Sequence, residues 1–207
     1  MAELGNYSEV SLANLALQYL GRGKFITALD EDSQAARVMR HQLPYTRDAV
    51  LRAYPWNFAQ RRAQIAADAA APDFEFAYSY PLPADCLWCH TVYGGNTQNW
   101  KVEGGKVYTD MSAPLEVKYT ARVVDLASAD PLFFQAVAAR LGADCATSLT
   151  ESAGKASDLW SVYQQKLREA RMIDAQEGQP ESLPQGSWHD GRLANSTFAP
   201  YADWDGN

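Results

Sequence analysis

The sequence predicts an α+β fold: a helical bundle with an inserted small antiparallel β-sheet or sandwich domain and an irregular C-terminal arm. Three observations lead to this prediction. Apolar residues recur with helical spacing in the first and last thirds of the chain, alternate with polar residues in the middle, and lose their periodicity after Gly178. We therefore expect a first helical part at 1–72, a β domain at 73–123, a second helical part at 124–178 and an extended arm at 179–207.

Two helices are expected in the first part. Ser8 can cap a helix that ends at Gly21, because a serine oxygen accepts from the first free N–H groups and glycine tolerates the left-handed stop. The acidic turn Asp30–Ser33 suits the positive end of a second helix. Both starts therefore have a chemical signal as well as a periodic one.

Two prolines interrupt the second helical pattern. Pro44 lies inside it, so we expect a kink there or a break into two helices. Pro55 ends the pattern, and a shorter amphipathic piece is expected to follow as far as Ile65. The alanine-rich stretch 66–71 then leads out of the helical part.

The middle of the chain has the two-residue period of β-strands. Gly104-Gly105 is a strong signal for a two-residue hairpin turn, because both positions of such a turn favour positive φ. Four or five antiparallel strands in about 50 residues make a small sheet or sandwich. The expected strands are 74–80, 87–93, 100–103, 106–109 and 115–123.

Helices return at Asp130-Pro131, an N-cap followed by a proline at the first helical position. One apolar stripe is expected to be buried along the helix that follows: Phe134, Val137, Ala138, Leu141, Cys145 and Leu149. A last long helix is expected to bury Ala156, Leu159, Tyr163, Leu167, Ala170 and Ile173.

Net charge and composition limit the classes of function that this protein can have. The 207 residues carry a formal net charge of -7, with 18 Lys and Arg against 25 Asp and Glu. A protein that holds nucleic acid through its phosphates usually has a basic surface instead. No membrane or secretory segment is recognised, and three cysteines without an export signal indicate reduced thiols. We expect synthesis in a cytoplasm and no membrane partner.

The sharpest chemical motif is Cys86-Leu87-Trp88-Cys89-His90, which satisfies the pattern for covalent haem attachment. Strand residues three apart point to opposite faces, so Cys86 and Cys89 should suit one haem poorly. A zinc or redox site lacks a second ligand pair, and packed strand cysteines are the structural alternative. We expect no metal, no cofactor and no catalytic site, and hence a protein that is not an enzyme.

The basic segment Arg37–Arg62, with six arginines against the single acid Asp48, stands out in this acidic chain. Its arginines have three alternative roles: a solvated face with partners inside the chain, an interface with acidic surfaces of neighbouring subunits or a portal, or DNA contact. The tail past residue 178 keeps large aromatic side chains, which suggests that it docks on a partner. The candidate interface residues are Arg37, Arg40, Arg47, Arg52, Arg61, Arg62, Trp188, Phe198, Tyr201 and Trp204.

The segment Tyr45–Ala59, called here the signature segment, carries a family resemblance. It contains R-D-x-x-L-R-x-Y-P-W-N-F-A and resembles the signature of the tail tubular protein A family, the head-to-tail adaptors of short-tailed bacteriophages. Leu29–Ser33, Tyr80–Leu87 and Leu115–Tyr119 match in the same order. The residues that carry the signature are Arg47, Asp48, Arg52, Tyr54, Pro55, Trp56, Asn57 and Phe58.

The resemblance implies a structural virion protein at the head–tail junction, made in the cytoplasm of the host bacterium. It implies a ring of roughly a dozen copies between the portal protein and a nozzle of the tail tubular protein B type, with DNA passing through the lumen. Trp56 and Phe58 can serve either the core or an interface. The alternative functions are a DNA-binding or packaging accessory and, less favoured, a metal or haem protein acting through Cys86, Cys89 and His90.

Overall fold

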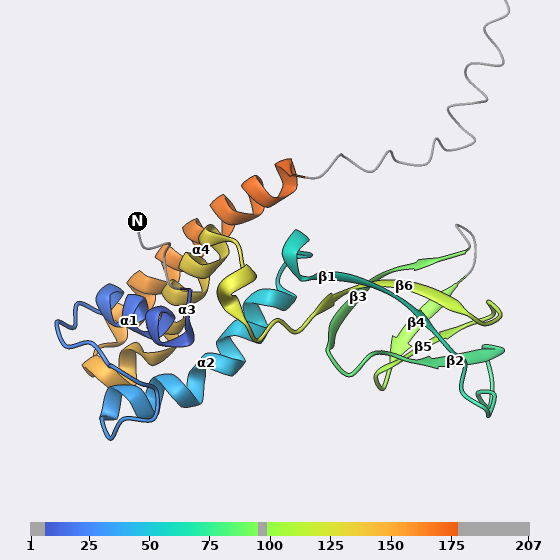
Figure 1. Ribbon diagram of the computed structural model, residues 1–207, viewed down its shortest axis with the longest axis horizontal. Coiled ribbons are helices and arrows are strands. Elements are labelled where there is room, and N and C mark those ends of the chain that lie inside the picture. Colours follow the sequence, from blue (N-terminus) through green and yellow to red (C-terminus); the bar gives the residue numbers. More distant parts are fainter. Residues whose placement is uncertain (1–6, 95–98, 178–207) are drawn as a thin grey trace, which may run out of the picture. The chain divides into compact units, whose positions relative to one another are not determined.

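The computed structural model describes residues 7–94 and 99–177, and it has an α+β fold with four helices and two small antiparallel sheets in those ranges (Figure 1). The six strands of these ranges all lie between the second and third helices in sequence. The helices are α1 (Glu9–Tyr19), α2 (Gln34–Arg52), α3 (Pro131–Thr150) and α4 (Ala153–Gln176). The strands are β1 (Gln60–Ile65), β2 (Tyr78–Pro81), β3 (Cys86–Tyr93), β4 (Trp100–Glu103), β5 (Lys106–Thr109) and β6 (Leu115–Ala121).

The predicted helix starts are confirmed. Ser8 caps α1 in a capping box with Ser11, and Ser33 caps α2 by accepting from the backbone N–H of Ala36. The carboxylate of Asp130 accepts from two N–H groups in the first turn of α3, at 2.7 and 3.1 Å. Gly21, with φ +74°, follows the end of α1 as the sequence predicts.

The helix α2 runs unbroken through Pro44, so the predicted alternative of a break into two helices is wrong. A proline inside a helix removes one backbone hydrogen bond and crowds the preceding turn. Here Leu43 and Thr46 on either side of it are buried, as is Val50 one turn later. Burial of these side chains outweighs the cost of the proline.

The strands form two three-stranded antiparallel sheets, in the orders β1-β6-β3 and β2-β5-β4. The hairpin of β4 and β5 turns at Gly104 and Gly105, whose φ values are +56° and +78°. Positive φ at both turn positions is the geometry that the glycine pair predicts. The strand pairing β3–β6 has two register shifts, between Cys86 and Trp88 and between Cys89 and Thr91.

The segment Gln60–Ile65 is a strand, where the sequence was expected to continue as an amphipathic helical piece. It pairs along its whole length with β6, from Gln60 opposite Thr120 to Ile65 opposite Leu115. The expectation failed because this pairing joins residues more than 50 positions apart, which local periodicity cannot report. The predicted helical part at 1–72 therefore contains the first strand of the β region.

The alternation from Phe74 to Tyr80 forms a strand only from Tyr78 onward. Glu75 has φ +71°, which lies outside the β region of the backbone map and stops the strand. Phe74 is consequently 81% exposed, not half-buried as the alternation predicts. Tyr80, at the other end of the alternating run, is fully buried.

Two clusters of buried apolar side chains lie in the described residues. The helical core joins α1, α2, α3 and α4 with the segment after α2, and it includes the whole stripe predicted along α3. The β core lies among the strands, around Tyr80, Val107 and Val117. On α4, Leu159, Tyr163, Leu167 and Ala170 are buried as predicted, whereas Ile173 is exposed.

The described residues, 7–94 and 99–177, belong to one compact unit, and the predicted arm at 179–207 lies outside them. None of the helices in 7–94 and 99–177 is long and apolar enough to cross a membrane.

Candidate functional site

The signature segment forms the last turns of α2, the turn after it and the short 3-10 helix η1 (Asn57–Ala59). Trp56 is fully buried in this turn, and its Nε1–H donates to the carbonyl oxygen of Val50 at 3.0 Å. That carbonyl lies in the last turn of α2 and also accepts from the backbone N–H of Ala53 at 3.1 Å. Trp56 thus fills the helical core and adds a second donor to a carbonyl at the end of α2.

Aromatic rings surround Trp56. Its ring centroid lies 5.0 Å from that of Phe133 and 5.1 Å from that of Tyr54, both edge-on. Phe58 meets Phe133 in the same way at 4.9 Å. Edge-on pairs of this kind each contribute about 0.5–1.5 kcal/mol beyond the area they bury. Of the two roles left open by the sequence, Trp56 takes the core role, and Phe58 is partly buried against the same core.

The signature segment is also fixed to the end of α4 through Asp174. The backbone N–H of Asn57 donates to both carboxylate oxygens of Asp174, at 3.1 and 3.3 Å. The side-chain amide of Asn57 donates to the backbone carbonyl of Asp174 at 2.6 Å. Burial raises the pKa of Asp174, because the residue is only 5% exposed and its carboxylate loses water that would solvate its charge.

Arg171 adds a second contact between α4 and the signature segment. Its guanidinium donates to the carbonyl of Ala53 at 2.6 Å and lies over the ring of Tyr54, 5.6 Å from the centroid. Burial raises the pKa of the Tyr54 hydroxyl, and the nearby carboxylate of Asp174 raises it further. The turn after α2 is thus held by hydrogen bonds, ring contacts and charge together.

Asp48 of the signature segment lies between two arginines. One carboxylate oxygen accepts from Arg47 at 3.2 Å and the other from Arg122 at 2.7 Å. Arg47 also lies 3.5 Å from Glu9 of α1 and is only 4% exposed. The prediction that Arg47 contacts a partner is therefore wrong: its guanidinium is buried within its own chain. Removing Asp48 would leave this buried charge poorly compensated.

Two further arginines connect to the strands. The guanidinium of Arg52, at the end of α2, donates to the carbonyl oxygen of Leu87 in β3. Arg61 of β1 pairs with Asp85 at 3.0 Å, and the hydroxyl of Tyr119 donates to the same carboxylate at 3.2 Å. Burial and the Asp85 carboxylate raise the pKa of Tyr119. Asp85 thus joins strands β1 and β6 at the start of β3.

The six arginines of the basic segment therefore fall into three groups: those with an ion pair, one with a carbonyl partner, and two without an ion pair in the described residues. Arg37, Arg47 and Arg61 have ion pairs inside the chain, and Arg52 has a carbonyl partner. Arg40 and Arg62 are exposed, and no ion pair forms for either within 7–94 and 99–177. The four aromatic residues predicted at the interface, Trp188, Phe198, Tyr201 and Trp204, lie outside the described residues.

The motif Cys86–His90 lies in β3, and the prediction that its two cysteines face opposite sides is wrong. The register shift between Cys86 and Trp88 adds one residue to the strand, so Cys86 and Cys89 both pack against the β core. Burial raises the pKa of both thiols, that of Cys89 to about 11. Metal ligation and thioether formation start from a thiolate, which this environment disfavours.

His90 has a local partner of its own. A ring nitrogen lies 2.6 Å from the hydroxyl of Thr120, and the ring meets Trp88 edge-on with centroids 4.1 Å apart. Burial lowers the pKa of His90, and the positive charge of Lys118 lowers it further. Both effects favour the neutral form of this imidazole, which lies between β3 and β6.

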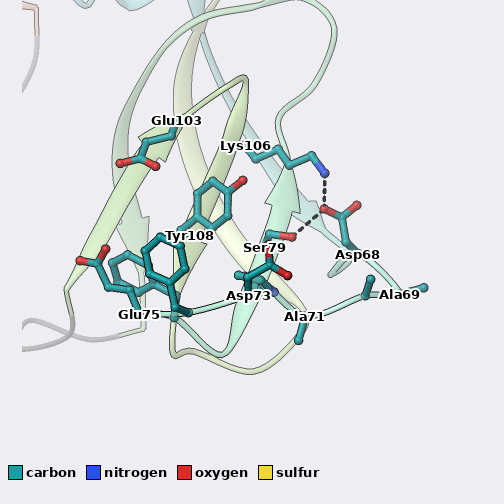
Figure 2. A pocket seen from close by; sticks show the side chains of 13 residues that line it. Asp68, Ala69, Ala71, Asp73, Glu75, Ser79, Glu103, Lys106 and Tyr108 are labelled. Atoms are coloured by element: carbon teal, nitrogen blue, oxygen red, sulfur yellow. Dashed lines mark hydrogen bonds and ion pairs between the residues drawn. The ribbon is translucent and has the colours of Figure 1, made fainter.

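A cavity of about 540 Å³ lies under the loop before β2, where Figure 2 shows Lys106 and Ser79 converging on Asp68. The carboxylate of Asp68 accepts from Ser79 at 2.7 Å and from Lys106 at 2.8 Å. These hydrogen bonds lower the pKa of Asp68, and the same pair raises that of Lys106. The backbone N–H of Asp68 also donates to the Ser79 carbonyl, so this cluster fixes the base of the loop.

Several residues that hold these contacts gave no local signal in the sequence. Phe133 and Asp174 lie among helical residues and differ from their neighbours only in what they contact. Asp85 and Arg122 lie beside predicted strands, and only their pairing partners give them a role. Covariation between distant positions is the signal that would find such residues.

Within 7–94 and 99–177, no group of three or more His, Cys, Asp or Glu side chains is placed to hold a metal ion. No model of a known protein family matches the chain, and comparison with curated proteins finds no match either.

Proposed function

We propose that this chain is a non-enzymatic structural virion protein, an adaptor that forms a ring between the portal and the tail nozzle of a short-tailed bacteriophage. The observation that carries the proposal is the signature segment, which resembles that of the tail tubular protein A family and occurs in order with three further matching segments. An ordered set of matches is more specific than any single motif of the chain.

The contacts of the signature segment give its residues a reason to occur together. Trp56, Asn57 and Asp48 tie the end of α2 to α3, α4 and the segment after β6. This arrangement supports a subunit whose helical and β regions form one unit and present different surfaces. A ring of identical copies needs two different complementary surfaces on each copy.

The charge of the chain suits a channel for DNA. The formal net charge of -7 works against retention of a polyanion, so DNA that passes through the lumen during packaging and ejection makes only transient contacts. The exposed Arg40 and Arg62, and the aromatic residues of 188–204, are the members of the predicted interface that stay candidates for contacts with the portal, the nozzle or a neighbouring copy.

The first test is negative-stain electron microscopy of the protein mixed with the portal of its phage, beside each component alone. We expect an additional ring stacked on one end of the portal. A folded protein that binds the portal at no molar ratio would overturn the adaptor role. A monomer in the absence of the portal would not, because assembly proteins can order their interfaces on a template.

A DNA-binding or packaging accessory is the second candidate, and it is favoured by Arg40 and Arg62, which are exposed and have no ion pair to the residues that the structure describes. Phosphate contacts make affinity fall steeply with salt. Retention of the protein on duplex DNA at low salt, lost at high salt and weakened by Arg62→Ala, would support this candidate. No retention at low salt would remove it.

A further inference from the structure

One side chain in the described residues is exposed in a way that its own fold does not explain. Phe74 is 81% exposed, the highest fraction among the exposed large apolar residues of those ranges. It lies between the carboxylates of Asp73 and Glu75, also exposed. We call Asp73–Glu75 the knob. An apolar ring held in water contributes nothing to the stability of the free chain, whereas burial in a partner would recover that free energy.

The knob is held in place by contacts on its C-terminal side. Glu75 keeps φ at +71°, a conformation that costs free energy for a residue with a side chain. Lys101 pairs with its carboxylate at 2.5 Å and lies 5.6 Å from the ring centroid of Phe76. The backbone N–H of Ala77 donates to Asp110 at 2.9 Å. A loop fixed in this way loses little conformational entropy when it binds.

A shallow pocket lies elsewhere in the β region, on the sheet β1-β6-β3. Its volume is about 470 Å³, large enough to take a benzyl group. Gln64, Glu116 and Tyr93 are opposite one another across the three strands. Tyr93 is 36% exposed and offers an aromatic surface. We call this the sheet pocket, and it is lined by Arg62, Ala63, Gln64, Tyr93, Glu116 and Val117.

The charges at the sheet pocket complement those of the knob. Arg62 is exposed and has no ion pair within 7–94 and 99–177, and Lys118 lies directly opposite it in the register. The carboxylate of Glu116 is the one acidic group in the lining, and it accepts from Gln64 at 2.8 Å. Two cations and one carboxylate on this face leave a net attraction for an acidic segment.

We infer that the knob of one copy inserts into the sheet pocket of a second copy of this chain, with Phe74 against Tyr93 and Asp73 beside Arg62. The contact joins different surfaces on the two copies, so it can repeat from copy to copy as a ring requires. The inference rests on the proposed ring for its biological meaning. It adds the surfaces through which neighbouring copies meet.

Sedimentation velocity over a concentration series, without and with the portal, tests this contact. We expect Phe74→Ser and Arg62→Asp each to weaken self-association by about tenfold or more, since each removes a central contact. Both side chains are exposed, so the fold should survive. Phe25→Ser, which removes another exposed ring, is the matched control and should associate like the wild type.

Mixing the two defective proteins gives the decisive result. Phe74→Ser keeps its sheet pocket and Arg62→Asp keeps its knob, so the mixture should form a dimer while each protein alone stays monomeric. A mixture without dimer, single variants that associate like the wild type, or a wild type that never self-associates would overturn the inference. If the variants still form rings on the portal, the knob contact is excluded and the adaptor function is retained. If association depends on the knob but no ring binds the portal, the contact is retained and the adaptor function is excluded.

Discussion

The helical and β regions of this chain differ in how many apolar side chains they bury in their cores. The helical core joins four helices and buries residues such as Leu12, Met39 and Phe133 completely. The β core is much smaller. Large apolar side chains remain exposed in both regions, for example Phe74 before the strands and Tyr45 on α2. The comparison suggests that the larger helical core provides most of the stability of the fold.

The largest expected effect on this comparison comes from Trp56→Ala, at the point where the helical region meets the strands. We expect a loss of about 3–5 kcal/mol in the free energy of unfolding, because a large cavity opens in the helical core and the Val50 carbonyl loses a donor. Urea unfolding followed by far-ultraviolet circular dichroism measures it. Tyr45→Ala, 65% exposed in α2, is the control and should change stability little.

The second-largest effect is expected from substitutions of Asp174, in the helical region. Asp174→Ala should cost about 1–3 kcal/mol in urea unfolding at neutral pH, because the backbone N–H of Asn57 loses its acceptor. Asp174→Asn keeps an acceptor and removes the charge.

The pKa of Asp174 is raised above 3.8, so its contribution to stability is fully present below that pH and is lost as pH rises through the raised pKa. Asp174→Asn should abolish this dependence. The same slope of stability with pH in the variant and the wild type would contradict the assignment.

The β hairpin is expected to respond less. Gly105→Ala places a side chain at φ +78° and should cost roughly 1 kcal/mol. Gly23→Ala is the matched control, since Gly23 has no positive φ and no atom within 4 Å of an added Cβ. Thermal unfolding of both variants measures the difference. An equal melting temperature for the two would show that the turn does not constrain the sheet.

The smallest expected effect is confined to acid pH and to the β region. The pKa of His90 is lowered below 6.5, so its contribution to stability is present above pH 6.5 and is lost as pH falls through the lowered pKa. His90→Gln should remove that loss and His41→Gln should not. Tryptophan fluorescence during urea unfolding at several pH values would follow it. The two groups would thus act in opposite directions: the contribution of Asp174 to stability is lost as pH rises above 3.8, and that of His90 is lost as pH falls below 6.5.

The parts of the fold that the sequence predicted correctly have local causes. The caps at Ser8 and Asp130 act within three residues, and the hairpin at Gly104-Gly105 needs only the backbone freedom of two glycines. These signals do not depend on the rest of the chain.

The parts that it missed have distant causes. β1 is a strand because β6 lies beside it, and the register shift in β3 turns both cysteines of the motif toward one core. The same holds for the site: the sequence predicts Arg47 as an interface residue, whereas in the fold its guanidinium is paired with Glu9 and Asp48. Charge along a sequence does not reveal which charges meet in the fold.

The contacts of the signature segment also have a mechanical consequence. The chain passes between helices and strands twice, once from α2 to β1 and once from β6 to α3. Asn57 fixes the first passage to α4, and Arg122 fixes the second to α2 through Asp48. Force applied to the strands would therefore reach α4 and α2 together. Separation of the strands from the helices under force must break the hydrogen bonds of Asn57 and the ion pair of Arg122 before a helix can unfold. The two regions should therefore move together under tension.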